Sequence, residues 1–288
     1  MKTGLVLEGG AMRGLFTAGV LDVMMENGIE YSGMIGVSAG ATFGCNYKSR
    51  QIGRTLRYNK RFAKDWRYCS VRSLIQTGDL YGAEFCYHIL PSELDKFDTR
   101  TFRENPMEFY VVCTDVKTGR PVYQKLTEGE SKDLEWIRAS ASMPVVSRPV
   151  EVDGYTLLDG GIADSVPIRF FEQAGYDRNV VVLTQPASYV KKKSSMMPIF
   201  GLLLSGMPAV LKAMEERPEV YNETLAYIRE KEEAGTLFVI RPSEKLDIGK
   251  TEHDPEKMEA VYLEGRKEGE KRLPALKLFL EGREGGSL

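Results

Sequence analysis

Hydrophobic residues fall into short runs and helical repeats along the first forty-five positions. Residues 4–7 form an apolar run that is typical of a short buried strand. Apolar side chains then recur at helical spacing over residues 16–23, and an Asn-Gly pair follows as a stop signal. A second strand is predicted at residues 31–35, and small residues at 39–45 can open another helix. This β-α-β order predicts parallel strands joined by a right-handed crossover.

Strand and helix patterns alternate through the remainder of the chain. Further strands are predicted at residues 109–113, 122–125, 148–152, 155–158, 180–183 and 237–240, and helices at 50–67, 134–140, 168–174, 208–233 and 256–280. Asp153-Gly154 is a strong hairpin signal between two of these strands. Pro274 is expected to interrupt the last helix. We expect residues 282–288 to be disordered.

These patterns predict an α/β protein with a mainly parallel central sheet. After residue 184 the composition changes, and long charged helical stretches replace the alternation of strands and helices. We therefore expect one domain over residues 4–184 and a mostly helical C-terminal extension over residues 185–288, packed on that domain. A length of 288 residues suits one large domain, or one domain with an appendage.

Composition narrows the class of protein further. Apolar residues make up 42% and charged residues 28%, which is ordinary for a globular chain. A net charge of -2 does not favour nucleic acid as a partner. The four cysteines lack C-x-x-C spacing, so we expect free thiols and no metal site. Glu8 and Arg13 interrupt the apolar N-terminus, so no secretory signal is predicted; we expect a cytoplasmic location, with peripheral membrane contact left open.

Two stretches could contact a lipid surface. Basic residues recur every three or four positions over residues 50–67, which fits a solvated helix face or an anionic-lipid surface. Residues 194–211 carry no charge and follow three lysines at 191–193, but prolines and glycines break the run. We expect a flap or membrane-docking segment in which Phe200 and Leu203 face lipid; a buried core helix is the alternative.

The candidate chemistry begins at Gly36-Val37-Ser38-Ala39-Gly40, a G-x-S-x-G motif. It lies between a predicted strand and a predicted helix. A serine on such a turn has an exposed hydroxyl above a helix N-terminus, and this makes Ser38 a candidate nucleophile. Because the pentapeptide also occurs by chance in loops, its context must decide.

A nucleophilic serine needs a base, and the chain contains only His88 and His253. The order Ser38, Asp159, His253 matches that of α/β-hydrolases. We do not favour this interpretation, since only one predicted strand precedes the strand that leads to Ser38, whereas the nucleophile strand of α/β-hydrolases follows several others.

A carboxylate could act directly as the base. Asp159 follows a strand and precedes Gly160-Gly161, so it would lie at a tight, open corner. The competing interpretation is a turn aspartate that caps its own backbone. Other carboxylates in or near loops are also candidates, and they are Asp115, Asp153, Asp164 and Asp177.

The turn after the first strand contains Gly9, Gly10, Ala11, Arg13 and Gly14. Its N–H groups could stabilise the negative oxygen that develops in acyl transfer, and Arg13 could steady the loop or an anionic headgroup. A dinucleotide fingerprint is less favoured, because alanine replaces the expected glycine at position 11. That fingerprint also wants an acidic residue at the end of the second strand, where Ser38 stands instead.

Together, the motifs at residues 8–14, 36–40 and 159–161 resemble those of the patatin-like phospholipase family. Residues 139–144 and 114–119 are also similar to family segments, and the likeness covers residues 4–184. The resemblance implies a three-layer α/β/α fold, a Ser38–Asp159 dyad and hydrolysis of lipid acyl esters without metal or cofactor.

Ala11 departs from the glycine that is usual in this family, and alanine does not favour a positive φ. Asp164 stands where asparagine is common. A lipid-binding protein with a decayed site and a nucleotide-dependent oxidoreductase are the alternatives.

Overall fold

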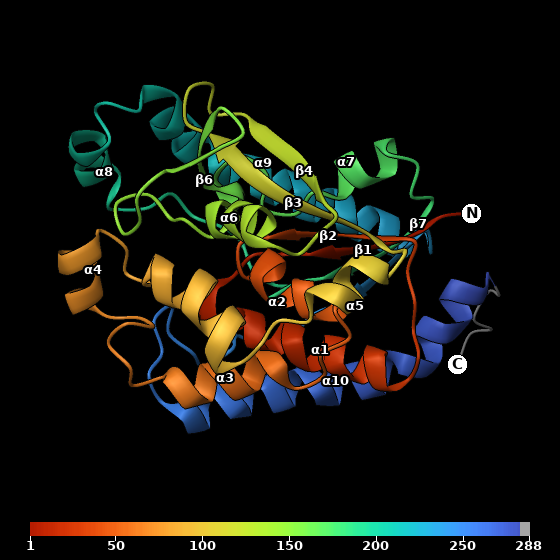
Figure 1. Ribbon diagram of the computed structural model, residues 1–288. Coiled ribbons are helices and arrows are strands. Elements are labelled where there is room, and N and C mark those ends of the chain that lie inside the picture. The colour runs from red at the N-terminus through yellow and green to blue at the C-terminus, as the bar shows by residue number, and fades with distance from the viewer. Residues whose placement is uncertain (283–288) are drawn as a thin grey trace.

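The computed structural model describes residues 1–282, in which one eight-stranded sheet forms the centre of the molecule (Figure 1). The strands are β1 (Thr3–Leu7), β2 (Gly33–Val37), β3 (Glu108–Asp115), β4 (Pro121–Leu126), β5 (Val150–Val152), β6 (Tyr155–Asp159), β7 (Arg178–Val182) and β8 (Leu237–Ile240). Their order is β5-β6-β3-β2-β1-β7-β8, and β4 pairs with β3. Strands β3, β2, β1, β7 and β8 run parallel to one another. The pairs β3–β4, β3–β6 and β5–β6 are antiparallel. The predicted α/β class is confirmed.

Helices cover both faces of the sheet (Figure 1). One face carries α1 (Gly14–Glu26), α2 (Ala39–Lys48), α3 (Arg54–Phe62), α5 (Thr99–Glu104) and α10 (Pro255–Glu281), and the other carries α7 (Ile168–Gln173) and α9 (Pro208–Glu233). The remaining helices of the described residues are η1 (Ala11–Arg13), α4 (Val71–Thr77), η2 (Phe85–Leu94), α6 (Ser131–Ser140), η3 (Gly160–Ile162) and α8 (Met197–Leu203).

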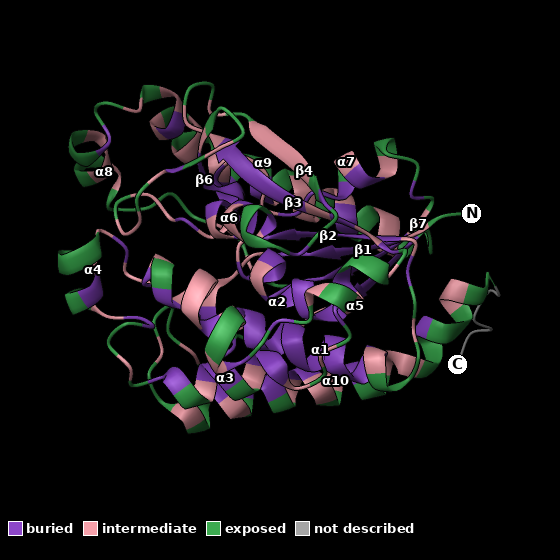
Figure 2. Cartoon of the chain, in the orientation of Figure 1, coloured by how far each residue is buried: buried purple, intermediate pink, exposed green. Residues whose placement is uncertain are grey.

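Alternate residues of each central strand face opposite layers. Leu5 and Leu7 belong to the hydrophobic cluster that contains Phe16 of α1. Val6, between them, belongs to a second cluster with Phe171 of α7. Both faces are therefore buried, which explains why the strands are apolar runs without polar alternation. Figure 2 shows the resulting buried strands between helices whose outer faces are exposed.

The C-terminal part extends the same sheet and covers the same core. β8 pairs with β7 in parallel, and α10 packs along α1. The two helices approach closely at glycines: a Cβ atom at Gly19 would clash with Tyr262 O, and one at Gly265 would clash with Phe16 O. A division of the chain at residue 184 stays a prediction.

Three predicted elements need correction. β2 begins and ends two residues later than predicted, directly before Ser38. The helix predicted over residues 50–67 is α3, which begins after Gly53 in a left-handed conformation (φ 72°) and ends at Phe62. Pro274 does not interrupt α10. Buried Leu276 and a 2.7 Å bond from Arg178 Nη1 to Phe279 O hold the segment beyond it. The disorder predicted for residues 282–288 concerns residues outside the described part of the chain, except for Gly282.

The broken apolar run forms the short helix α8, and none of its residues is buried. Leu202 and Leu203 are 77% and 56% exposed, whereas Leu204 directly after the helix is 4% exposed. The alternative of a buried core helix is therefore wrong for α8. Within residues 1–282 no helix combines the length and the apolarity needed to cross a bilayer.

Candidate active site

Ser38 occupies the turn between β2 and α2 in a strained conformation, with φ 53° and ψ -120°. The turn is tight because both motif glycines touch backbone. A Cβ atom at Gly36 would lie 2.6 Å from Gly40 C and O, and one at Gly40 would lie 2.5 Å from Leu7 O. Only glycine fits at these two positions, so the motif follows from packing around the serine.

Asp159, at the end of β6, meets Ser38 directly. Ser38 Oγ donates a 2.6 Å hydrogen bond to Asp159 Oδ2, although the residues are 121 positions apart. The other carboxylate oxygen, Oδ1, accepts a 2.7 Å bond from Gly161 N. Thr114 Oγ1 donates a 2.8 Å bond to the Asp159 carbonyl. Asp159 thus caps its own turn, as the competing interpretation held, and also faces the candidate nucleophile.

The protein environment of Asp159 stabilises the neutral form of its carboxyl group relative to the charged form, compared with the same group in water. Its side chain is buried, and this burial raises its pKa above the ordinary value. The hydrogen bond from Ser38 and the charge of Arg217 act in the opposite direction but do not cancel the effect of burial.

The turn that holds Ser38 is fixed by the hydroxyl of a second serine, Ser140, which the sequence did not single out as a site residue. Ser140, the last residue of α6, accepts a 2.9 Å bond from Ser38 N. Its own hydroxyl donates a 2.6 Å bond to Val112 O on β3. Asp159 N donates a 2.8 Å bond to the carbonyl oxygen of Ser142, which lies two residues after Ser140. Residues 139–144, which carried only a family likeness, therefore position both members of the pair.

The glycine-rich loop is held by a buried glutamate. Glu8 Oε2 accepts a 2.6 Å bond from Thr184 N, and Glu8 Oε1 accepts a 2.5 Å bond from Tyr221 Oη. Tyr221 belongs to α9 in the C-terminal part. No local sequence pattern predicts these anchors, because Glu8, Thr184 and Tyr221 lie far apart in the chain.

The loop runs close to Ser38. A Cβ atom at Gly9 would lie 2.9 Å from Val37 O and 3.0 Å from Ser38 Cβ. Ala11 has φ 50°, so the expectation that alanine would avoid a positive φ here is wrong. Within residues 1–282, the N–H groups of Gly10, Ala11 and Ala39 donate no hydrogen bond to protein acceptors.

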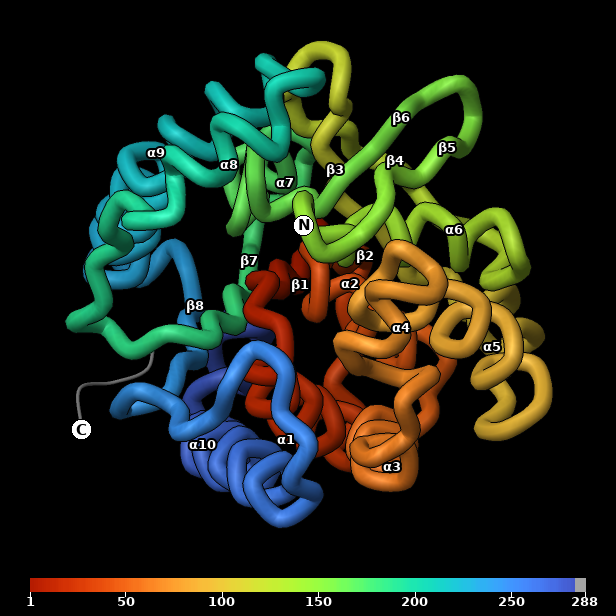
Figure 3. Tube along the Cα trace, turned by 90° about the vertical axis from the view of Figure 1, so that its left-hand side faces the viewer, coloured from red at the N-terminus to blue at the C-terminus, as the bar shows by residue number. Residues whose placement is uncertain are grey.

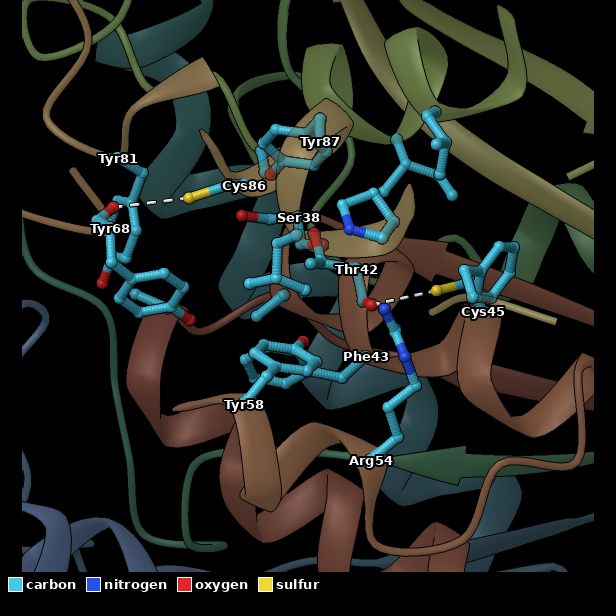
Figure 4. A pocket seen from close by; sticks show the side chains of 18 of the residues that line it. Ser38, Thr42, Phe43, Cys45, Arg54, Tyr58, Tyr68, Tyr81, Cys86 and Tyr87 are labelled. Atoms are coloured by element: carbon cyan, nitrogen blue, oxygen red, sulfur yellow. Dashed lines mark hydrogen bonds between the residues drawn. The ribbon is translucent and has the colours of Figure 1, made fainter. Parts of the chain in front are cut away.

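An apolar pocket opens beside the serine (Figure 4). It contains about 930 Å³ of atom-free space including its mouth. Aromatic and aliphatic side chains make up most of its wall, among them Phe43, Tyr58, Tyr87, Leu134, Ile137 and Met143. Cys45 also lines it as a free thiol, and burial raises the pKa of that thiol to about 12. The apolar lining of this pocket suits an apolar ligand.

Both histidines have partners elsewhere. His88 Nε2 lies 3.0 Å from Glu135 Oε1, and His253 Nδ1 lies 2.8 Å from Ala63 O. Across residues 1–282 neither histidine bonds to Ser38 or Asp159. The α/β-hydrolase triad is thus not assembled.

The competing carboxylates are also engaged away from Ser38. Asp115 accepts a 2.7 Å bond from Thr118 Oγ1, and Asp164 accepts a 2.8 Å bond from Tyr123 Oη. Trp136 Nε1 donates to Asp153, and Lys2 N donates to Asp177. The described residues contain no group of three or more His, Cys, Asp or Glu side chains that could hold a metal ion.

The fold is that of a known family. The sequence profile of the patatin-like phospholipases matches residues 5–171, and the chain belongs to that family. Residues 207–281 match a second profile, described as a domain of unknown function (DUF6363).

Individual relatives are distant. The uncharacterized protein YjjU of Escherichia coli is 29% identical over 191 residues, which are 65% of this chain and 53% of that protein. The lysophospholipase nte1 of Aspergillus oryzae is 28% identical over 61% of this chain and 11% of its own length. The chain thus spans about half of the first relative and about a tenth of the second. The solved structure of VipD from Legionella pneumophila aligns with a TM-score of 0.47 at 14% identity, over 95% of this chain and 67% of that one.

Proposed function

We propose that this protein is a lipid acyl hydrolase that cleaves carboxylic esters through a Ser38–Asp159 dyad. The observation that carries the proposal is the 2.6 Å hydrogen bond from Ser38 Oγ to Asp159 Oδ2. Family membership and the lysophospholipase relatives favour a lipid ester as the substrate, of the phospholipase A, lysophospholipase or esterase type. The apolar pocket at the serine supports this choice, since an acyl chain could occupy it.

The first half of the reaction forms an acyl-enzyme. Ser38 Oγ attacks the ester carbonyl carbon while its proton passes to Asp159 Oδ2. The negative carbonyl oxygen would lie against the free N–H groups of Gly10, Ala11 and Ala39. The tetrahedral intermediate then collapses, and the leaving alcohol takes the proton from Asp159.

The second half releases the fatty acid. Asp159 removes a proton from water, which attacks the acyl carbon, and Ser38 leaves with that proton restored. A carboxylate with an ordinary pKa is a weak base, so the raised pKa of buried Asp159 suits both proton transfers.

A lipid hydrolase must also reach its substrate at a membrane or micelle. β1 begins beside the N-terminus, so its carboxyl end points toward the end of the molecule that bears α4 and α8 (Figures 1 and 3). Both helices expose apolar side chains there, and the most exposed are Ile75 at 79% and Leu202 at 77%. We infer that α8, with α4, docks on the lipid surface and that the lysines before α8 attract anionic headgroups.

The direct test is the substitution Ser38→Ala. A purified Ser38→Ala protein should lose ester hydrolysis by at least about ten-thousand-fold, because the nucleophile is gone. Its circular dichroism spectrum should match that of the wild type. The wild type should be labelled covalently by a fluorophosphonate, and the variant should not.

Retained hydrolysis in the variant would refute Ser38 as the nucleophile. A wild type that binds lipid but resists the fluorophosphonate would favour a lipid-binding protein with a decayed site.

A further inference from the structure

The apolar pocket runs along helix α2, away from the turn that holds Ser38. Thr42 and Cys45, one and two turns into the helix, line the pocket together with Ser38. At the helical rise of about 1.5 Å per residue, Cys45 lies roughly 10 Å from Ser38 along the helix axis. An acyl chain whose carbonyl lies at Ser38 would therefore extend along α2 toward the end of that helix.

A buried arginine lies at this far end of the pocket. Arg54, the first residue of α3, is 4% exposed and lines the pocket. Figure 4 shows its side chain pointing toward Thr42 and Cys45. Its guanidinium carbon lies 5.3 Å from the centroid of the Tyr58 ring and 5.4 Å from that of the Phe97 ring, and both rings also line the pocket. The apolar pocket thus ends at a cation beside two aromatic rings.

Hydrogen bonds fix the guanidinium of Arg54 and leave part of it free. Nη1 donates a 2.8 Å bond to Asn46 Oδ1, and Nη2 donates a 2.6 Å bond to Asp95 O. Nε donates a 3.2 Å bond to the same carbonyl oxygen. A guanidinium has five N–H groups. Within residues 1–282 these bonds use one N–H on each nitrogen, so Nη1 and Nη2 each keep a second N–H for another acceptor.

The charges around Arg54 do not balance. Asp95 is the one carboxylate among the described residues that pairs with Arg54, at 3.2 Å from Nε to Oδ1. Arg57 binds both oxygens of the same carboxylate, at 2.7 Å from Nε and 2.8 Å from Nη2. Two guanidinium groups therefore share one carboxylate, which leaves a net positive charge. Arg57 does not line the pocket, so Arg54 presents this charge there.

We propose that Arg54 binds a carboxylate at the far end of the acyl chain, so that the preferred substrate is an ester of a medium-chain dicarboxylic acid. This inference rests on the proposed function and names the acyl group of its substrate. The two free N–H groups can donate to the two oxygens of a carboxylate, and the net positive charge favours an anion over a neutral group. The apolar wall between Ser38 and Arg54 would hold the methylene chain.

Binding to the Ser38→Ala protein tests the proposal without requiring hydrolysis. The probes are methyl octanoate, monomethyl suberate and dimethyl suberate, which share one acyl chain length and differ at the far end. Monomethyl suberate should bind at least about tenfold more tightly than both neutral esters in titration calorimetry. The matching adipate and sebacate esters extend the comparison to a shorter and a longer chain. If the half-ester is preferred at none of the three lengths, the proposal is overturned.

Replacing the arginine shows where the carboxylate binds. In the same background, Arg54→Met should lower the affinity for monomethyl suberate to that for methyl octanoate, with little change for the two neutral esters. The variant should fold, because Asp95 keeps both bonds from Arg57 and no buried charge loses its partner. A folded variant that still prefers the half-ester would overturn the proposal. If Arg54→Met does not fold, the comparison of the three esters on the Ser38→Ala protein still decides.

Arg61→Met is the matched control, because it removes the same charge from the same helix. Arg61 is exposed, donates a 2.8 Å bond to Leu94 O and does not line the pocket. This variant should keep the preference for the half-ester. Loss of the preference in Arg61→Met would show a general effect of charge and would overturn the assignment to Arg54.

Hydrolysis by the wild type separates a failure of this inference from a failure of the proposed function. The kcat/KM for the mono-p-nitrophenyl ester of suberic acid should be at least about tenfold higher than that for p-nitrophenyl octanoate. Equal cleavage of both esters would overturn this inference alone. Cleavage of neither, with the preference in binding intact, would refute the proposed hydrolysis and still support the carboxylate site at Arg54.

Discussion

At the scale of single residues, the surroundings of Asp159 act on its carboxylate in two opposite ways. Two hydrogen bonds hold its carboxylate at the serine, yet burial costs the charged form more than these bonds return. A group kept in such a state reduces the free energy of unfolding, and this is common where function requires an unfavourable environment.

The raised pKa leads to a prediction about stability. Above the folded-state pKa of Asp159, the folded protein carries a buried charge that the unfolded chain exposes to water. Between the ordinary value of 3.8 and the raised value, the folded state binds more protons, so this contribution lowers stability as pH rises. Asp159→Asn should therefore unfold at a higher temperature than the wild type at pH 8, and the difference should shrink toward pH 4.

Asp247→Asn is the control, because Asp247 is exposed. A wild type that is more stable than Asp159→Asn at pH 8 would show that the hydrogen bonds outweigh burial.

Sequence alone predicted that Ser38 and Asp159 act together, because each lies in a local motif that specifies a turn, and the structure places their side chains within hydrogen-bond distance. It did not identify Ser140, Tyr221 or Arg217. Their roles depend on which segments meet in space, and no local pattern encodes a contact between α9 and a loop near the N-terminus.

At the scale of elements, apolar runs predicted strands well because the central strands are buried on both faces. The predicted ends of helices were wrong where the conformation or packing of a single residue decides where the helix begins or ends. Gly53 adopts a left-handed conformation and delays α3, whereas packing and the Arg178 cap carry α10 past Pro274.

The exposed helix α8 gives a prediction about membrane contact. Phe200 is half-buried, so Leu202 and Leu203 are the better positions to alter. Leu202→Asp with Leu203→Asp should release the protein from anionic liposomes in a sedimentation assay, since two charges oppose insertion. The fold and the hydrolysis of a water-soluble ester should be unchanged.

Leu263→Asp is a matched control on α10, where Leu263 is 53% exposed. It should leave liposome binding intact. Equal liposome binding by the double variant and the wild type would refute α8 as a docking element.

At the scale of the whole molecule, the part after residue 184 contributes β8 to the sheet, α10 to the core and Tyr221 to the glycine-rich loop. The change in composition at that point is real in the sequence, but composition does not show which surfaces meet. Gly19 and Gly265 allow α1 and α10 to pack closely, and the buried hydrogen bond from Tyr221 to Glu8 joins α9 to the loop.

The crossing of α1 and α10 should be sensitive to volume. Gly265→Ala places a methyl group against Phe16 O, and such overpacking should lower the free energy of unfolding by about 1–3 kcal/mol in chemical denaturation. Gly206→Ala is the control, because a Cβ atom there meets nothing within 4 Å. An unchanged midpoint for Gly265→Ala would show that α10 is not held tightly against α1.

The central claim is that an aspartate, and no histidine, activates Ser38. The most direct test compares two variants in the hydrolysis of a water-soluble ester. Asp159→Asn should lose activity by about ten-thousand-fold or more, because the amide cannot take up the serine proton. The double variant His88→Ala, His253→Ala should stay within a few-fold of the wild type, since both rings bond elsewhere. An inactive but folded double-histidine variant, or an active Asp159→Asn protein, would contradict the account.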